Sequence, residues 1–190
     1  MAALRHTGRV PAIRAPRLSD GEIALRALAP VDVPAIVAAC QDPEIPRWTS
    51  VPSPYTREDA YRFLAIAATE ASAGEGIALA VADARDRLIG TIGLMEIDDT
   101  RGEIGYWTAA PARGRGVAPR AVALLRDWAH LELGIGELEI LAHRDNHPSQ
   151  RVAERAGFAD TGEIRSVARM PPGRREGFRL YVWRAPAPRR

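Results

Sequence analysis

The segment from Gly102 to His130 constrains the fold of this chain more than any other part of its sequence. It reads GEIGYWTAAPARGRGVAPRAVALLRDWAH: a short extended stretch, a turn of glycine and arginine, and an amphipathic helix. The first amides of a helix have no partner within the helix, and the helix macrodipole favours anions at that end. The segment therefore predicts a strand, a turn and a helix that can hold a phosphate-bearing ligand without a metal ion.

Length and composition indicate one globular domain. The chain has 190 residues, of which 46% are hydrophobic, enough to bury a core without disulfides. No apolar run approaches the roughly 20 residues of a membrane helix, and the N-terminus lacks the apolar region of a signal peptide. We therefore expect a cytoplasmic protein without a membrane partner, with a flexible tail over residues 1–17, a domain over 18–185 and a basic tail over 186–190.

Charge and cysteine content exclude several other classes of protein. The net charge of +2 is too small to predict a nucleic-acid partner, although the chain has arginine and no lysine, and RGRG also occurs in RNA-binding tails. Cys40 is the only cysteine, which excludes an intramolecular disulfide and a cysteine-based zinc site. His143 and His147 have no third ligand at a diagnostic spacing, so we expect no metal.

Hydrophobic periodicity predicts an α+β fold. A meander of three antiparallel strands, at residues 77–83, 88–97 and 103–108, is followed by a helix that starts after Gly116. That helix crosses over to a strand at residues 137–143, which predicts a parallel pair in a mostly antiparallel sheet. The remaining expected elements are strands at 23–27, 160–168 and 178–183, helices at 29–42, 56–71 and 145–158, and an irregular proline-rich loop at 43–55.

The turn fits neither of the two common nucleotide-binding motifs. A P-loop needs a lysine followed by Ser or Thr after its glycines, and a dinucleotide site needs GxGxxG early in a parallel sheet. Neither pattern occurs here. Gly114 and Gly116 would still let a ligand approach the backbone closely, with the amides from Arg115 to Ala118 pointing into the turn.

Two sequence blocks resemble the GNAT superfamily of acyl-CoA N-acyltransferases. The family's motif, Gln or Arg followed by two residues, Gly, one residue and Gly or Ala, appears here as Arg113, Gly116 and Ala118. The second block, an Asn that leads a helix ending in Gly-Phe, appears as Asn146 and Phe158. EIGYW, PARGRGVA and NHPSQRVAERAGF are most similar to the ribosomal-protein N-terminal acetyltransferase branch, RimJ and RimL. The resemblance covers roughly residues 18–183.

This resemblance implies a fold, an activity and a binding site. The fold is a central, mostly antiparallel twisted sheet with one splayed parallel strand pair, flanked by helices. The activity is transfer of an acetyl group from acetyl-CoA to a protein N-terminus or a small-molecule amine, by a monomer or homodimer. The implied acetyl-CoA-binding residues are Trp107, Thr108 and Ala109 for the pantetheine, Arg113, Gly114, Arg115, Gly116, Val117 and Ala118 for the pyrophosphate, and Asn146 and Ser149 near the thiol.

The chain departs from the family pattern at two positions. Pro119 lacks a backbone N–H where relatives usually have one, which removes a possible phosphate donor. Ala153 occupies the position of a tyrosine that many relatives use to protonate the leaving thiolate. Ser149 is the replacement that we predict, and the alternative is that its hydroxyl only supports the start of the helix.

Direct acyl transfer also requires a group that takes the proton of the attacking amine. Glu103 and Glu139 lie one on each strand of the expected splay, and either could be this base or a solvent-facing charge. Glu44, in the proline-rich loop, is a third candidate on the acceptor side, where Trp48 would shape the pocket. Because the sequence does not identify one base or one hydrogen-bond donor to the thiolate, a non-catalytic acyl-CoA-binding or regulatory module is the alternative function.

Overall fold

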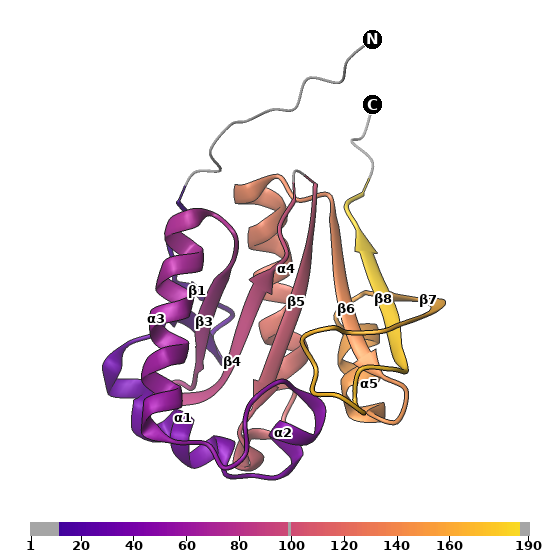
Figure 1. Cartoon of the computed structure of the whole chain (residues 1–190). Coiled ribbons are helices and arrows are strands. Elements are labelled where there is room, and N and C mark those ends of the chain that lie inside the picture. Colours follow the sequence, from indigo (N-terminus) through magenta and orange to yellow (C-terminus); the bar gives the residue numbers. More distant parts are fainter. Residues whose placement is uncertain (1–11, 99, 187–190) are drawn as a thin grey trace.

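An eight-stranded sheet forms the centre of the computed structural model, which describes residues 12–98 and 100–186 (Figure 1). Its strand order is β1-β2-β3-β4-β5-β6-β8-β7. The strands are β1 Leu18–Ser19, β2 Ala24–Ala27, β3 Ile77–Ala82, β4 Leu88–Met95, β5 Arg101–Thr108, β6 Glu137–His143, β7 Ala159–Arg165 and β8 Phe178–Arg184.

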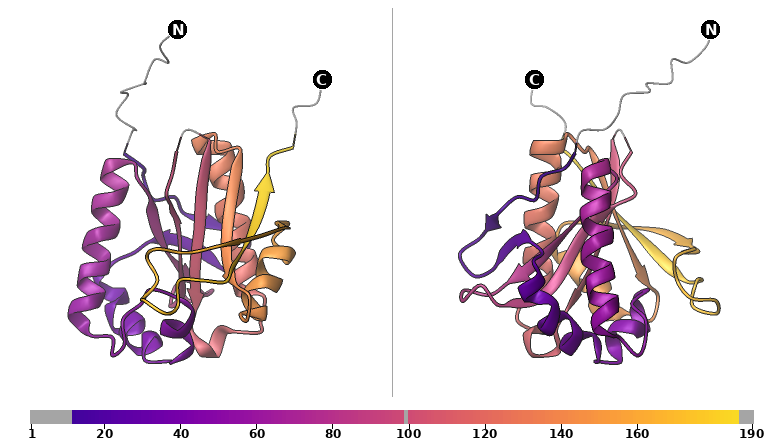
Figure 2. Two further views of the ribbon diagram at one scale, coloured as in Figure 1. Left: turned by 45° about the vertical axis from the view of Figure 1, so that its right-hand side comes forward. Right: turned by 60° about the vertical axis from the view of Figure 1, so that its left-hand side comes forward.

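Helices cover both faces of this sheet. They are α1 Val33–Cys40, α2 Glu44–Trp48, α3 Arg57–Ala73, α4 Val117–Leu133 and α5 His147–Arg155, with short 3₁₀ turns at Pro30–Asp32 and Ala110–Ala112. Figures 1 and 2 show α3 on one face and α4 on the other. Helix α3 packs on β3 and α1, whereas α4 packs on β5 and α5. Within the described residues, no helix has both the length and the apolar character needed to cross a membrane.

The observed elements confirm the predicted α+β arrangement except in the proline-rich segment. Residues 43–55 were expected to be an irregular loop, but they include the helix α2. Pro43 caps this helix and Pro46 lies in its first turn, where no backbone N–H is needed for an intrahelical bond, so the two prolines are compatible with it. The two-residue strand β1 was not predicted, because so short a strand has no visible alternation.

The parallel strand pair is short, and this shortness creates the splay. Strands β5 and β6 pair only from Arg101↔Glu137 to Glu103↔Glu139. Beyond that point β6 continues to pair with β8 along its whole length, and β5 continues to pair with β4. The two strands therefore separate after Glu103, as expected for a mostly antiparallel sheet with one splayed parallel pair.

Two apolar clusters hold the elements in place. The larger lies between the sheet and α4 and includes Leu125 and Leu138, both fully buried. The smaller lies between α1, α2 and α3 and includes Ile36 and Cys40. Burial raises the pKa of the Cys40 thiol to about 12, so this cysteine is a small apolar side chain and not a reactive thiolate.

Residues before position 18, where the predicted domain begins, already pack against the rest of the structure. Ile13 is buried against the larger cluster, and its amide donates a hydrogen bond to the carbonyl of Ala71 at 2.8 Å. This contact places Ile13 against the end of α3, while the division of the chain into a tail over residues 1–17 and a domain from residue 18 stays a prediction. Residues 1–11 and 187–190 of the two predicted tails lie outside the described residues.

A buried ion pair at the start of α1 supports the smaller cluster. Both terminal nitrogens of Arg26 donate to the Asp32 carboxylate at 2.8 Å, and the Ala29 amide donates to it at 2.9 Å. Burial alone would raise the pKa of Asp32, but these hydrogen bonds outweigh it and hold that pKa below its ordinary value.

We expect Asp32→Asn to lower the free energy of unfolding at neutral pH by about 1.5–3 kcal/mol, because hydrogen bonds to a charged group are lost. The folded-state pKa of Asp32 is below the unfolded value of about 3.9. The stabilisation is therefore complete above that value and is lost as the pH falls through the folded pKa. Urea unfolding of both proteins at neutral and acid pH measures this. Asp127→Asn, at an exposed ion pair, should change stability by about 0.5 kcal/mol or less.

Candidate active site

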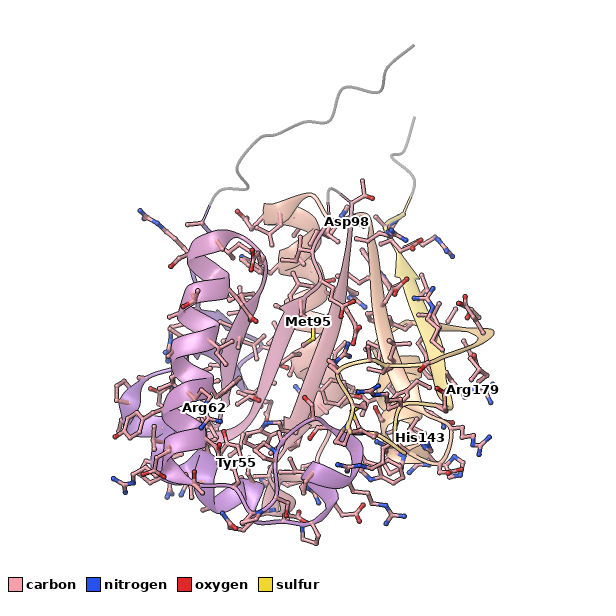
Figure 3. All side chains as sticks on the ribbon, in the orientation of Figure 1. Tyr55, Arg62, Met95, Asp98, His143 and Arg179 are labelled. Carbon is pink, nitrogen blue, oxygen red and sulfur yellow. The ribbon has the colours of Figure 1, made fainter. Side chains whose placement is uncertain are left out.

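A cleft of about 720 Å³ opens where β5 and β6 separate. Its lining comes from the turn before α4, the first turn of α5, helices α2 and α3, and the loop between β7 and β8. Figure 3 shows the labelled Met95 in the middle of the sheet and His143 near its lower end, and both belong to this lining. The cleft therefore passes from the α4 side of the sheet, through the splay, to the α3 side.

The turn before α4 has the open backbone that the glycines predicted. Gly114 and Gly116 both have φ in the left-handed region, at +72° and +74°, where other residues are strained. No atom lies within 4 Å of the position that a Cβ on Gly114 would occupy, so a ligand can approach the backbone there. The amide of Arg120 donates to the carbonyl of Gly116 at 3.3 Å, and the amides that precede it in the first turn have no acceptor one turn earlier in α4.

Two arginines near this turn, Arg113 and Arg120, form ion pairs with aspartates. Arg113 Nη1 lies 2.7 Å from Asp42 Oδ2, and this ion pair lacks the alignment of a hydrogen bond. Arg113 Nε donates a hydrogen bond to the Thr108 carbonyl at 3.0 Å. Arg120 pairs with Asp20 at 2.9 Å, and Arg115 does not line the cleft. The turn therefore presents its backbone to the cleft, and Arg113 ties that backbone to the connection between α1 and α2.

The backbone groups that face the gap between β5 and β6 are shifted by one residue from those predicted. The Ala109 amide donates to the Ile89 carbonyl at 2.9 Å, beside β4. Because backbone direction alternates along an antiparallel pair, the backbone groups of Trp107 also face β4, and those of Tyr106 and Thr108 face the gap between β5 and β6. Thr108 keeps its predicted orientation. Ala109 and Trp107 do not offer backbone groups to the gap, because β4 already pairs with them.

The start of α5 brings two predicted residues and one unpredicted residue together. Asn146 caps the helix, and its Oδ1 accepts a hydrogen bond from the Ser149 amide at 3.2 Å. The hydroxyl of Tyr106, on β5, lies 2.9 Å from Ser149 Oγ. All three residues line the cleft. Sequence reasoning missed Tyr106, although strand alternation places it on the same face as the buried Ile104.

Glu103 lies at the point where the strands separate and is only 4% exposed. Arg169, from the β7–β8 loop, donates to both of its carboxylate oxygens, with Nη1 at 3.1 Å from Oε2. Burial raises the pKa of Glu103, and the charge and hydrogen bonds of Arg169 only partly offset this effect. A carboxylate with a raised pKa inside a cleft has the properties of a general base.

Glu139 is in a different environment, although it is the register partner of Glu103. Its carboxylate accepts a hydrogen bond from Arg165 Nη1 at 2.7 Å, and the residue does not line the cleft. Its negative charge adds to the raised pKa of Glu103. The structure therefore separates the two candidate bases, and only Glu103 faces the cleft.

Glu44 and Trp48 lie together in α2 and line the cleft on the acceptor side. Trp48 Nε1 donates to Glu44 Oε2 at 3.0 Å, and the Trp48 ring lies 5.5 Å from the His143 ring. Hydrogen bonds from Trp48 and Arg47 hold the pKa of Glu44 below its ordinary value. Glu44 is thus a solvated carboxylate that positions Trp48, and it is a weaker base than Glu103.

The described residues contain no group of three or more His, Cys, Asp or Glu side chains placed to hold a metal ion.

Residues 22–159 match the acetyltransferase (GNAT) domain, and this match covers most of the chain. The chain therefore belongs to the GNAT acetyltransferase family, and the fold class and acyltransferase class predicted from the sequence are confirmed.

Among proteins known by sequence, the chain is similar to YdaF from Bacillus subtilis (strain 168), which carries the provisional name ribosomal N-acetyltransferase. The two are 36% identical over 80 residues, which make up 41% of this chain and 44% of YdaF. The chain thus aligns with less than half of the length of this relative.

Solved structures with the same fold cover nearly the whole chain. Mycobacterium smegmatis RimJ in complex with CoA-disulfide has a TM-score of 0.78 at 17% identity, covering 90% of this chain and 87% of that one. Vibrio cholerae spermidine N-acetyltransferase in complex with CoA and spermine has a TM-score of 0.73 at 17% identity, covering 87% of this chain and 96% of that one. At these identities the likeness shows the fold.

Proposed function

We propose that this protein transfers an acetyl group from acetyl-CoA directly to a primary amine, either a protein N-terminal α-amine or a small-molecule amine. The observation that carries the proposal is the continuous cleft, which joins the glycine turn before α4, the gap-facing edge of β5 and the buried carboxylate of Glu103. Family membership supports the reaction class, and the CoA-bound relatives support acetyl-CoA as the donor.

The residues of the α4 side fit acetyl-CoA. The amides from Gly114 to Ala118 would bind the pyrophosphate, helped by the positive end of the α4 dipole. The gap-facing backbone groups of Tyr106 and the amide of Thr108 would pair with the pantetheine amides, as a further strand would, whereas the Thr108 carbonyl already accepts a hydrogen bond from Arg113 Nε. Asn146 and Ser149 would lie beside the thioester, at the start of α5.

The residues at the splay supply what direct transfer requires. Glu103 takes the proton of the amine as its nitrogen forms a bond to the thioester carbon. The carbon–sulfur bond breaks, the electron pair leaves on sulfur, and the Ser149 hydroxyl donates a hydrogen bond to the thiolate. An α-amine, with a pKa of about 7.7–8.0, needs less help from the base than a lysine amine, with a pKa of about 10.4.

The acceptor would approach from the α3 side, past Glu44, Trp48 and the β7–β8 loop. YdaF carries the provisional name ribosomal N-acetyltransferase, and the Vibrio cholerae protein is named spermidine N-acetyltransferase. We include both acceptor classes in the proposal. The cytoplasmic location, the monomeric or homodimeric state and the absence of a nucleic-acid partner stay predictions from the sequence.

The proposal is tested by release of the CoA thiol across a panel of peptides with free N-termini, polyamines and aminoglycosides. We expect release with at least one class of amine, and one acetylated amine for each thiol released. Acetyl-CoA binding without turnover on any amine would instead support the non-catalytic acyl-CoA-binding module.

A substitution at Arg169 tests Glu103 as the base through pH dependence. Arg169 lowers the pKa of Glu103, so Arg169→Gln should raise that pKa further. The base acts when deprotonated, so the acid limb of kcat/KM should move to higher pH. Arg179→Gln is the matched control, because Arg179 is an equally exposed arginine that pairs with Asp160, outside the cleft. An acid limb that does not move in Arg169→Gln would contradict the assignment.

A further inference from the structure

The hydroxyl of Tyr106 is joined to Ser149 across the splay, and the reaction as described does not use it. Tyr106 belongs to β5 and Ser149 to α5, 43 positions further along the chain, yet their oxygens lie 2.9 Å apart. The same tyrosine oxygen is 3.4 Å from the Ser149 carbonyl, a longer and weaker contact.

Ser149 is held at two points. Its amide donates to Asn146 Oδ1 at 3.2 Å, which fixes its backbone in the first turn of α5. Its Oγ contacts Tyr106, which fixes its side-chain rotamer. A serine hydroxyl has one hydrogen and otherwise rotates to suit any acceptor, so a second contact of this kind decides where the hydrogen points.

The direction of the hydrogen bond follows from the burial of Tyr106. Burial raises the pKa of Tyr106 to about 12, so the phenol keeps its hydrogen at neutral pH. Ser149 Oγ is the nearer of the two acceptors for that hydrogen. When Tyr106 donates to Ser149, the hydrogen of Ser149 is free to be donated into the cleft.

We propose that Tyr106 is a positioning residue that orients the Ser149 hydroxyl so that its hydrogen is donated to the departing thiolate of coenzyme A. The inference rests on the proposed function, in which Ser149 stabilises the leaving group. A hydroxyl that accepts one hydrogen bond also donates a stronger one, because chains of hydrogen bonds polarise one another.

No proton leaves Tyr106 in this step. A phenol with a pKa of about 12 is a weaker acid than a thiol, whose ordinary value is about 8.5 for cysteine, so transfer from tyrosine to thiolate is unfavourable. The electron pair of the broken carbon–sulfur bond stays on sulfur. Ser149 donates a hydrogen bond to it, and the thiolate takes its proton from water after release. Ala153 has no hydroxyl, is fully buried and does not line the cleft, so it offers no donor to the sulfur.

The test uses CoA alone, so it does not depend on any acceptor. The pKa of the CoA thiol bound to the full-length protein is measured from the ultraviolet absorbance of the thiolate, for the wild type, Tyr106→Phe and Ser149→Ala. We expect the bound thiol in each variant to have a pKa about one unit higher than in the wild type, since one pKa unit corresponds to 1.36 kcal/mol of lost stabilisation. Tyr61→Phe, at a half-exposed tyrosine of α3 outside the cleft lining, should match the wild type.

A double-mutant cycle gives the second readout. We expect Tyr106→Phe to lower kcat about tenfold, equal to about 1.4 kcal/mol, with the KM for acetyl-CoA nearly unchanged. The double variant should be no slower than Ser149→Ala alone, because both substitutions remove the same donor.

Each result distinguishes the inference from the proposed function. An unchanged thiol pKa or an unchanged kcat in Tyr106→Phe would overturn the inference and leave acetyl transfer intact. Such a result would mean that the Ser149 hydroxyl donates its hydrogen bond to Tyr106, and that the Tyr106 hydroxyl donates to the Ser149 carbonyl. If the thiol pKa shifts as expected but no amine is acetylated, the inference holds and the proposed transfer fails. Failure of the wild type to bind CoA would overturn both.

Discussion

Glu103→Gln is expected to lower kcat by about 10²- to 10⁴-fold, the usual contribution of a positioned general base. Glutamine has the same shape as glutamate and can still accept a hydrogen bond from Arg169, so the β7–β8 loop keeps an anchor. It cannot take a proton from the amine. Steady-state kinetics with the best amine of the panel measure the effect. The KM for acetyl-CoA should change little, because Glu103 precedes Tyr106 and Thr108, the expected pantetheine contacts, on β5.

The control is Glu139→Gln, at the register partner of Glu103 on β6. Glu139 pairs with Arg165 outside the cleft, so this variant should retain most of the wild-type kcat. Its small effect should be a lower pKa of Glu103, because one neighbouring negative charge is lost. A Glu103→Gln variant within about twofold of the wild type, well short of the effect of a general base, would show that water or another group is the base.

Gly116→Val is expected to raise the Kd for acetyl-CoA at least about tenfold. Its φ of +74° is in the left-handed region, which costs an L-residue about 1–2 kcal/mol and is worst for a β-branched side chain. The backbone of the turn would relax away from this conformation and carry its amides away from the pyrophosphate. Isothermal titration with acetyl-CoA measures the loss.

The same helix provides a matched control at its other end. Gly134 caps the C-terminus of α4 with a φ of +72°, and no atom lies within 4 Å of the position of its Cβ. Gly134→Val should therefore lower the free energy of unfolding about as much as Gly116→Val, but leave acetyl-CoA binding unchanged. Equal Kd values for the two variants would contradict the assignment of the pyrophosphate to the turn before α4.

The fold could be predicted because its signals are local. Alternating or helical hydrophobic patterns predicted β3 through α4, and β6 was predicted with its observed bounds. Helix α2 was missed because its two prolines, Pro43 and Pro46, are typical of loops, yet both fall where a helix tolerates them.

The site was predictable only where its residues are neighbours in sequence. The turn from Arg113 to Ala118 is one continuous motif, and Asn146 and Ser149 lie within one helical turn. The choice between the two candidate bases depends on Arg169 and Arg165, which lie 66 and 26 positions from their partners. No local pattern shows which carboxylate a distant loop will bury.

The contact of Tyr106 with Ser149 is non-local in the same way. Strand alternation could have placed the tyrosine on the α5 side of the sheet, but its distance from the serine depends on how far the strands separate. The prediction that backbone groups of Trp107 and Ala109 face the gap failed for a related reason. The phase of hydrogen bonding with β4 is set by strand register, which the sequence alone does not reveal.

We propose that one cleft binds acetyl-CoA and transfers its acetyl group to an amine without a covalent enzyme intermediate. The most direct measurement is a reaction with acetyl-labelled CoA, followed for thiol, labelled amine and labelled protein in the same tube. We predict equal amounts of thiol and labelled amine, and no labelled protein when the amine is left out. Label that stays on acetyl-CoA with every amine, or that appears on the protein before amine is added, would contradict the account.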